Sequence, residues 1–581
     1  MQNGTIPTKV KKNGIEWTVR KGYEDLQDRF NLTCLHSALQ KIPHTIIKDT
    51  KVRSVFFIPD SDTNMRGIYV KCFKERDSRD FNKYLDCVKH LFVRTKAETE
   101  WNVGNRLLSK EINTALPLAI AENRSWFFRK NSMLITGAIP DSKSLIDFCQ
   151  SSFHDTQSEE ASIRKKNLIN TLAEFVRDIH SKGFFHSDFH AGNILIQFHH
   201  DHTGQDQPYS FYLIDLHHVK ILKTLSKRKI LYNLAQLFNS LSSSLTQYDR
   251  RQFFQSYGKD SFGKQKERQK LVDQIDTISC RLRFTHYKSR LKRCLKRSSL
   301  FSKRKFDGFT IFFRKGYDTE FFFDLLEKHD TALAHKLCDT ILKQDRKTIL
   351  TRHPFQDKEI QTVVVKHYKS PPGFGLIKNS FRKSPGKKAW ISGNGLLLYG
   401  FDAPLPLTLI EKRVLGVVTD SYLIMEAVSH SLEMDRYIVK NFHDQEESRL
   451  PVIVKMKRSF IDQFAQIIAK MHNKRVFHHD LKTCNIMVKA NSAFDFTFLD
   501  FDKVTFGKNV RIRERIRNLT QINLSTPGCI TLKDRLRFLG EYLRQCNLQE
   551  AKRTIRNEIS AMSKREKILY VTGKGDVTED W

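Results

Sequence analysis

Long apolar runs, paired cysteines and an excess of acidic charge are all missing from this 581-residue sequence. No window reaches the roughly 18 apolar residues that a membrane-spanning helix needs, and the N-terminal MQNGTIPTKVKKNG lacks the apolar core of a signal peptide. The ten cysteines show neither CxxC pairs nor metal-ligand spacing, which argues against a disulfide-rich or zinc-stabilised scaffold. These absences predict a cytoplasmic protein whose cysteines are reduced core residues.

Basic residues dominate the charge: 99 Lys and Arg stand against 64 Asp and Glu, a formal net charge of +35. Such an excess attracts polyanions, among them nucleic acid, anionic lipid and phosphorylated sugar. No recognised nucleic-acid module is present, so no nucleic-acid partner is expected. The densest segment, residues 281–305, contains no acidic residue and places Tyr287, Leu291 and Leu295 at helical spacing. It is either a solvated helix that closes a domain or a surface that contacts anionic membrane or substrate.

Three motifs occur twice, in the same order and at nearly the same displacement. RKGY stands at residues 20–23 and again at 314–317. YVKCFK, which contains Lys71, pairs with VVKHYK, which contains Lys366. FFHSDFHAGNILI pairs in the same way with VFHHDLKTCNIMV. Because ordered repeats of this kind are hard to obtain by chance, the chain is a tandem duplication.

Each half begins with β-rich sequence and continues with helical periodicity. SVFFI and GIYVKCF in the first half and TVVVKHY in the second have the β-branched character of strands. Residues 168–180 and 460–472 have helical apolar spacing and lead directly into the repeated HxD motifs. We therefore expect an α+β protein of two domains, each with a β-rich N-lobe and a helical C-lobe. The predicted bounds are 1–304 for the first domain, with lobes of about 1–136 and 137–304, and 305–581 for the second, with lobes of about 305–426 and 427–581.

Both halves contain a strand lysine, then H-x-D-x-x-x-x-N, then an Asp that closes an apolar run. The two sets are Lys71, His186, Asp188, Asn193 and Asp215, and Lys366, His478, Asp480, Asn485 and Asp500. Phosphoryl transfer from ATP needs a cation on the phosphates, a carboxylate that takes the proton of the acceptor hydroxyl, and oxygen ligands for magnesium. The lysines fit the first role and the HxD aspartates, Asp188 and Asp480, fit the catalytic one. The asparagines and the later aspartates fit the metal site.

These motifs resemble the lipopolysaccharide kinase (Kdo/heptose kinase) family of the protein-kinase-like superfamily. IDLH after HSDFHAGNILI is similar to the heptose kinase branch, and LDFDK after HHDLKTCN to the Kdo kinase branch. Residues 96–122 and 387–411 are similar to the helix, leucine pair and proline-led strand of the family. The resemblance implies two tandem bilobal kinase-like domains that use ATP and Mg²⁺. It also implies that Glu100 pairs with Lys71, with Glu98 as the rival, and that Lys482 belongs to the nucleotide site.

The second half departs from this pattern. Ala389 occupies the position of Glu100, and no acidic residue lies between Lys366 and Asp402. Basic residues fill the stretch instead; they are Lys369, Lys378, Arg382, Lys383, Lys387 and Lys388, and they face either phosphate-bearing substrate or water. This half therefore either uses a non-standard nucleotide site or is a degenerate domain that binds without catalysing.

The predicted activity is ATP-dependent phosphorylation of a sugar hydroxyl in the lipopolysaccharide inner core, heptose or Kdo, or in a related anionic glycolipid. Peripheral contact with the inner face of an anionic membrane would suit the basic charge. Neither half has a G-x-G-x-x-G loop or an A-P-E motif, which argues against an ordinary protein kinase. The alternatives are a protein kinase, an aminoglycoside-type kinase, whose cationic substrate a basic protein would repel, and a tandem protein with one or both halves catalytically inactive.

Overall fold

The chain forms two compact units in the computed structural model, Met1–Arg283 and Phe284–Trp581. The structure describes residues 7–12, 14–26, 44–50, 52–60, 66–73, 94–125, 128–152, 159–198, 209–242, 244–258, 265–317, 319–355, 360–369, 383–414, 416–443, 450–491, 493–567, 570–571 and 577–578. The division falls within helix α8 (Gln265–Leu291), whereas the sequence placed it at residue 304. The observed division lies earlier in the chain because Phe284, Tyr287 and Leu295 pack on the core of the second unit.

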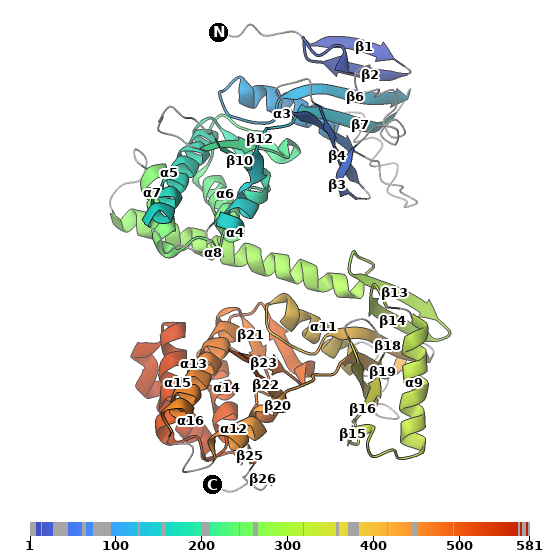
Figure 1. Ribbon diagram of the computed structural model, residues 1–581, viewed down its shortest axis with the longest axis vertical. Helices are drawn as coiled ribbons and strands as arrows, with labels where there is room; N and C mark the ends of the chain where they lie inside the picture. The colour runs from blue at the N-terminus through green and yellow to red at the C-terminus, as the bar shows by residue number, and fades with distance from the viewer. Residues whose placement is uncertain are drawn as a thin grey trace. The chain divides into compact units, whose positions relative to one another are not determined.

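The first unit opens with a seven-stranded antiparallel sheet in the order β1-β2-β6-β7-β5-β4-β3 (Figure 1). Its strands are β1 (Thr8–Lys12), β2 (Ile15–Val19), β3 (Thr45–Asp49), β4 (Arg53–Pro59), β5 (Gly67–Phe73), β6 (Pro117–Ser125) and β7 (Phe128–Gly137). The strands predicted at SVFFI and GIYVKCF are β4 and β5. Helix α3 (Lys96–Leu108) contacts β5, β6 and β7, so its buried side meets the strand that carries Lys71.

Helices dominate the rest of the first unit. They are α4 (Leu145–Ser152), α5 (Glu159–Ser181), α6 (Lys227–Ser240), α7 (Gln247–Tyr257) and α8. Short strands and 3₁₀ turns carry the repeated motif; they are β8 (Ser142–Ser144), β9 (Phe184–His186), η2 (Ala191–Asn193), β10 (Ile194–Phe198), β11 (Tyr209–Leu213), η3 (Leu216–His218) and β12 (Val219–Ile221). The helix predicted over 168–180 is the second half of α5, and it ends just before β9.

The second unit repeats this plan, with its seven strands in the order β13-β14-β18-β19-β17-β16-β15. These strands are β13 (Phe301–Phe306), β14 (Phe309–Arg314), β15 (Ile341–Gln344), β16 (Thr348–Pro354), β17 (Thr362–Lys369), β18 (Pro406–Val414) and β19 (Val417–Glu426). The helices are α9 (Thr319–Ala334), α11 (Pro385–Leu398), α12 (Met434–Phe442), α13 (Pro451–Asn473), α14 (Ile512–Ser525), α15 (Leu532–Cys546) and α16 (Lys552–Ser563). The 3₁₀ turns and remaining strands are η4 (Lys292–Leu295), β20 (Leu432–Glu433), β21 (Val476–His478), η6 (Thr483–Asn485), β22 (Ile486–Ala490), β23 (Phe494–Phe498), η7 (Phe501–Lys503), β24 (Val504–Phe506), η8 (Gln549–Ala551), β25 (Tyr570–Val571) and β26 (Val577–Thr578). Equal strand orders in the two units confirm the predicted duplication of an α+β fold.

The repeated RKGY motif ties a helix to the sheet in each unit. The Arg20 guanidinium donates from Nε to the Pro117 carbonyl, 2.8 Å away, and from Nη2 to the Asn105 side chain in α3. Arg314 in the second unit makes the matching bonds, from Nε to the Pro406 carbonyl at 2.9 Å and from Nη2 to the amide oxygen of an asparagine in α11 at 2.6 Å. Since α3 carries Glu100, this arginine helps to fix the helix that approaches the strand lysine.

The apolar side of the basic segment 281–305 is used for packing inside the second unit. Tyr287 packs on Tyr399 with ring centroids 4.4 Å apart, and the Arg475 guanidinium lies 4.2 Å from the centroid of the Phe284 ring. Leu295 also contacts the core, while most of the lysines and arginines between 288 and 305 stay exposed. The segment therefore closes the second unit through its apolar side chains and presents charge to the outside.

Acid should destabilise the second unit through His472. This imidazole is buried; its Nδ1 lies 2.7 Å from the Tyr542 hydroxyl and its Nε2 3.0 Å from Asn518 Oδ1. Burial lowers the pKa of His472 to about 4. Between pH 6.5 and 4 the unfolded chain therefore takes up a proton that the folded chain does not, and stability falls with the pH. From pH 7 to 5 we expect a loss of about 2 kcal/mol from this residue alone.

Denaturant unfolding at the two pH values measures this loss. His472→Gln keeps hydrogen-bonding groups but cannot titrate, so its stability should change less over the same interval. Equal changes in the two proteins would contradict the assignment.

Candidate active sites

The strand lysine of the first unit is held by a buried glutamate. Thr95 caps α3 by accepting a hydrogen bond from the Glu98 amide at 3.0 Å, and the helix then turns Glu100 inward. Lys71 Nζ lies 2.8 Å from Glu100 Oε2, and Glu100 is only 2% exposed. Glu98, the rival, lies instead 3.6 Å from Arg94. Burial alone would raise the pKa of Glu100, but Lys71 and His217 outweigh it and hold the pKa below its usual value.

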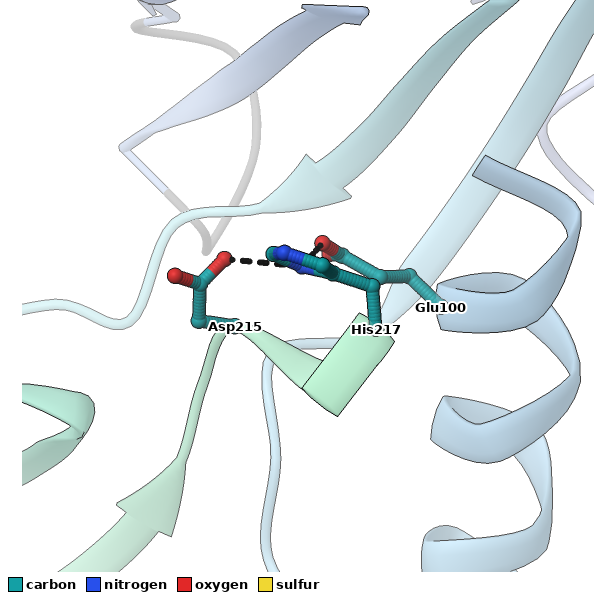
Figure 2. Close-up of side chains that lie close together, drawn as sticks. All are labelled: Glu100, Asp215 and His217. Carbon is teal, nitrogen blue, oxygen red and sulfur yellow. Dashed lines mark hydrogen bonds and ion pairs between the residues drawn. The ribbon is translucent and has the colours of Figure 1, made fainter. Parts of the chain in front are cut away.

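His217 links Glu100 to Asp215, as Figure 2 shows. Its Nδ1 lies 2.8 Å from Glu100 Oε1 and 3.2 Å from Asp215 Oδ1. Burial disfavours the charged imidazole, but the two carboxylates outweigh burial and raise the pKa of His217. The three side chains offer atoms within 4.8 Å of one another, as a metal site would. The same nitrogen, Nδ1, faces both carboxylates, and a nitrogen that donates a hydrogen bond cannot also ligate a metal, so His217 acts here as a bridge between carboxylates.

Asp188 lies on a loop that its own neighbours hold in place. The Asp188 amide donates to His186 Nδ1 at 3.1 Å, and His186 Nε2 lies 3.3 Å from the Ile214 carbonyl. Burial lowers the pKa of His186 to about 4, so the ring stays neutral and can donate at one nitrogen while it accepts at the other. The Asp188 side chain is half exposed, and the hydrogen bond from His190 holds the pKa of the carboxyl below its usual value. An ionised carboxylate open to solvent can accept a proton from a substrate hydroxyl.

Asn193 and Asp215 fit a magnesium site. The Asn193 amide nitrogen donates to the Asp188 carbonyl at 2.8 Å, which leaves the amide oxygen as an acceptor. Asp215 lies two residues after the end of β11 and adopts a left-handed backbone conformation, with φ of 62°. Burial would raise the pKa of Asp215, but His217, Lys71 and Arg53 lower it, so the carboxylate is ionised. Oxygen donors of this kind are what Mg²⁺ prefers.

Arg53 is a site residue that the sequence analysis missed. It begins β4, and its Nη1 contacts Asp215 Oδ1. The β3–β4 turn just before it, held by the Thr50 amide bonded to the Arg53 carbonyl at 2.9 Å, contains no glycine. No spacing or repeat in the sequence singles this arginine out.

Helix α6 supports the Asp188 loop with three polar side chains, which the sequence analysis also missed. Asn233 Nδ2 donates to the His186 carbonyl at 2.5 Å, and Gln236 Nε2 donates to the Ser187 carbonyl at 2.9 Å. The Ala191 amide donates to Ser240 Oγ at 2.9 Å. The matching contacts in the second unit come from Asn518, Gln521 and Ser525 at 2.6, 2.9 and 2.9 Å. NLAQLFNS and NLTQINLS are a fourth repeated motif that could have revealed these residues.

The second unit brings its predicted residues together differently. Lys366 lies 2.6 Å from Asp500 Oδ1 and 3.0 Å from Asp502 Oδ2, and the Tyr368 hydroxyl donates to Asp502 Oδ1 at 2.6 Å. Ala389 is fully buried at the position of the missing glutamate. Burial disfavours the ammonium, but Asp502 and Asp500 outweigh burial and raise the pKa of Lys366.

The loop of the second unit matches that of the first. Asn485 Nδ2 donates to the Asp480 carbonyl at 3.1 Å, and Asp480 is partly exposed. Lys482 Nζ lies 3.4 Å from Asp480 Oδ1, where the first unit has His190 at 3.6 Å from Asp188. Each HxD aspartate therefore lies within 4 Å of a side-chain nitrogen two residues on.

Only part of the basic stretch before and within α11 is described. Lys378 and Arg382 lie outside the described residues. Lys387 lies 3.7 Å from the buried Glu411 and 4.9 Å from the centroid of the Phe312 ring. This lysine therefore makes contacts within its own domain.

An antiparallel sheet whose strand lysine pairs with a buried glutamate, followed by a helical lobe that carries the HxDxxxxN loop and a later aspartate, defines a protein-kinase-like phosphotransferase fold. The sequence model of the lipopolysaccharide kinase (Kdo/WaaP) family matches residues 46–257 and 394–542, more than half of the chain. The chain belongs to this family. The second matched stretch begins inside α11, after Lys366 and Ala389.

Individual relatives agree with the family. The chain is 29% identical over 163 residues to the lipopolysaccharide core heptose(I) kinase WaaP of Escherichia coli, and 28% identical over 163 residues to that of Pseudomonas aeruginosa. Each match covers 28% of this chain and 59% of the relative's length. A solved structure of WaaP in complex with acyl carrier protein aligns at 20% identity and a TM-score of 0.34, over 45% of this chain and 97% of that one.

Proposed function

We propose that this protein transfers the γ-phosphoryl group of ATP to a sugar hydroxyl of the lipopolysaccharide inner core. Membership of the Kdo/WaaP family carries the proposal, together with the Lys71–Glu100 pair beside the Asp188 loop. The curated relatives are heptose(I) kinases, so heptose is the first acceptor to test. Because the chain spans about 59% of their length, the acceptor is inferred from the shared site and not from the whole protein.

The residues divide the work of the reaction. Lys71 would contact the α- and β-phosphates of ATP while Glu100 and His217 hold it in place. Asp188 would orient the sugar hydroxyl and accept its proton as the oxygen bonds to the γ-phosphorus and the bond to ADP breaks. Asp215 and Asn193 would hold Mg²⁺, which neutralises charge on the phosphates.

The basic surface supports an anionic acceptor at a membrane. In the part of the chain that the structure describes, no helix is long and apolar enough to cross a bilayer. A net charge of +35 favours phosphate- or carboxylate-bearing glycolipid and disfavours a cationic aminoglycoside. We therefore propose peripheral contact with anionic lipid during phosphorylation.

A comparison of acceptors tests the proposal. Purified protein is incubated with ATP, Mg²⁺ and, separately, inner-core lipopolysaccharide, an aminoglycoside or a generic protein substrate. Transfer to lipopolysaccharide should exceed transfer to either of the others. Transfer only to the aminoglycoside or the protein would favour the other kinase classes.

The polar side chains of α6 that hold the Asp188 loop should affect turnover more than nucleotide affinity. Asn233 is fully buried, and Asn233→Ala removes a bond that holds the loop before Asp188. A small displacement of that loop costs up to about 100-fold in rate, so we expect kcat to fall about 10- to 100-fold while KM for ATP stays within about threefold. Measurement in an Asp480→Asn background isolates the first unit.

Asn167→Ala, an exposed asparagine of α5, is the matched control and should leave both constants unchanged. A rise in KM for ATP without a change in kcat would show that α6 acts on nucleotide binding and not on the loop.

A further inference from the structure

The second unit keeps a buried lysine although it lacks the helix glutamate that holds its counterpart. Lys366 is 7% exposed, and burial of a lysine without a partner is costly. Three positions around it differ together from the first unit. Glu100, His217 and Phe73 are replaced by Ala389, Asp502 and Tyr368.

In the first unit, the carboxylate that pairs with the lysine comes from helix α3, and the residue two positions after the magnesium aspartate is a histidine. Glu100 contacts Lys71 and His217, and the Phe73 ring packs edge-on against His217, with ring centroids 6.1 Å apart. His217 Nδ1 faces both Glu100 and Asp215, so the helix carboxylate, the histidine and the magnesium aspartate form one connected network.

In the second unit, the carboxylate that contacts the lysine comes from a different position in the sequence. The carboxylate now belongs to Asp502, two residues after Asp500, and it contacts Lys366 directly at 3.0 Å. The Tyr368 hydroxyl, absent from Phe73, donates to the other oxygen of Asp502 at 2.6 Å. Loss of the glutamate, gain of Asp502 and gain of the Tyr368 hydroxyl are therefore three parts of one exchange, and together they leave the lysine paired with a carboxylate.

A degenerate site would need none of these replacements, since a lysine without a function is removed most simply by substitution with an apolar residue. We propose that Asp502 is the positioning residue for Lys366, and that the second unit is a separate binding site for a magnesium nucleoside triphosphate. This inference rests on the proposed function. In this structure Lys366 contacts both Asp500, at 2.6 Å, and Asp502. When nucleotide binds, Asp502 keeps Lys366 in place, and Asp500 becomes free to bind the metal.

Calorimetric titration of the full chain with Mg²⁺ and the non-hydrolysable analogue AMP-PNP tests the inference. Wild type should bind two equivalents, and Lys71→Met should leave one, in the second unit. In that Lys71→Met background, Asp502→Asn should weaken the remaining site tenfold or more. Asp495→Asn, which removes an exposed carboxylate of the same unit, should leave the affinity unchanged.

A double-mutant cycle separates positioning from a general structural effect. If Asp502 acts through Lys366, Asp502→Asn adds little to the loss caused by Lys366→Met, whereas independent effects would add. Additive losses, or an affinity that Asp502→Asn leaves unchanged, would overturn the role of Asp502. If wild type binds one equivalent and Lys71→Met abolishes it, the second site does not exist although the first unit stands. Absence of any binding to wild type would instead refute the proposed function itself.

Discussion

Asp188→Asn should reduce phosphate transfer by the first unit about 10²- to 10⁴-fold, the usual contribution of a general base. The amide keeps the size of the side chain but cannot take the proton of a sugar hydroxyl. Nucleotide affinity should stay within about threefold, because in the proposed site Lys71 contacts the phosphates, and Asp215 and Asn193 hold the metal, without Asp188. Initial rates with inner-core lipopolysaccharide, measured in an Asp480→Asn background, give the effect directly.

Asp178→Asn is a suitable control, since Asp178 is an exposed carboxylate on α5 in the same lobe. It should behave as wild type. Retention of most transfer activity by Asp188→Asn would remove this residue from the chemistry. A large loss of nucleotide affinity would assign it to binding instead.

Glu100→Gln should damage both the stability and the activity of the first unit. The carboxylate is buried between Lys71 and His217, at 2.8 Å from each. Its neutralisation leaves Lys71 and His217 without the buried carboxylate that they share, and breaking a buried pair of this kind costs about 3 kcal/mol. The freed lysine should also lower kcat/KM for ATP about tenfold or more. Denaturant unfolding and steady-state kinetics measure the two effects.

Glu98→Gln gives a matched comparison two residues earlier on the same helix, away from its buried side. Glu98 pairs with the exposed Arg94 at 3.6 Å, and such pairs contribute about 1 kcal/mol or less. Its stability and kinetics should therefore stay close to wild type. If Glu98→Gln proved the more harmful change, the pairing of Lys71 with Glu100 would be wrong.

The tandem architecture could be predicted from the sequence because its markers are local and repeated. The strand lysines, the HxDxxxxN loops and the later aspartates each lie in short runs whose spacing a reader can compare between halves. Glu100 could be placed by its position before Trp101, which matches Ala389 before Trp390. The helix over 168–180 follows from apolar periodicity, although α5 begins earlier, at Glu159.

Contacts between distant segments could not be predicted in this way. Arg53 contacts Asp215 from strand β4, and Asp502 contacts Lys366, each across more than a hundred residues of sequence and with no periodicity to indicate the pairing. The sequence showed that Lys366 lacked its usual partner but not that a second carboxylate replaced it. The position of the division inside α8 could not be predicted either, because it depends on which core Phe284 and Tyr287 contact.

Mass spectrometry of the reaction product tests the central proposal most directly. Wild-type protein is incubated with ATP, Mg²⁺ and heptose-containing inner-core lipopolysaccharide, and ADP release is followed in the same samples. The account predicts one added phosphoryl group on an inner-core sugar for each ADP formed, and no such product from the Asp188→Asn, Asp480→Asn double variant. ADP release without phosphorylated sugar, or equal product from the double variant, would contradict it.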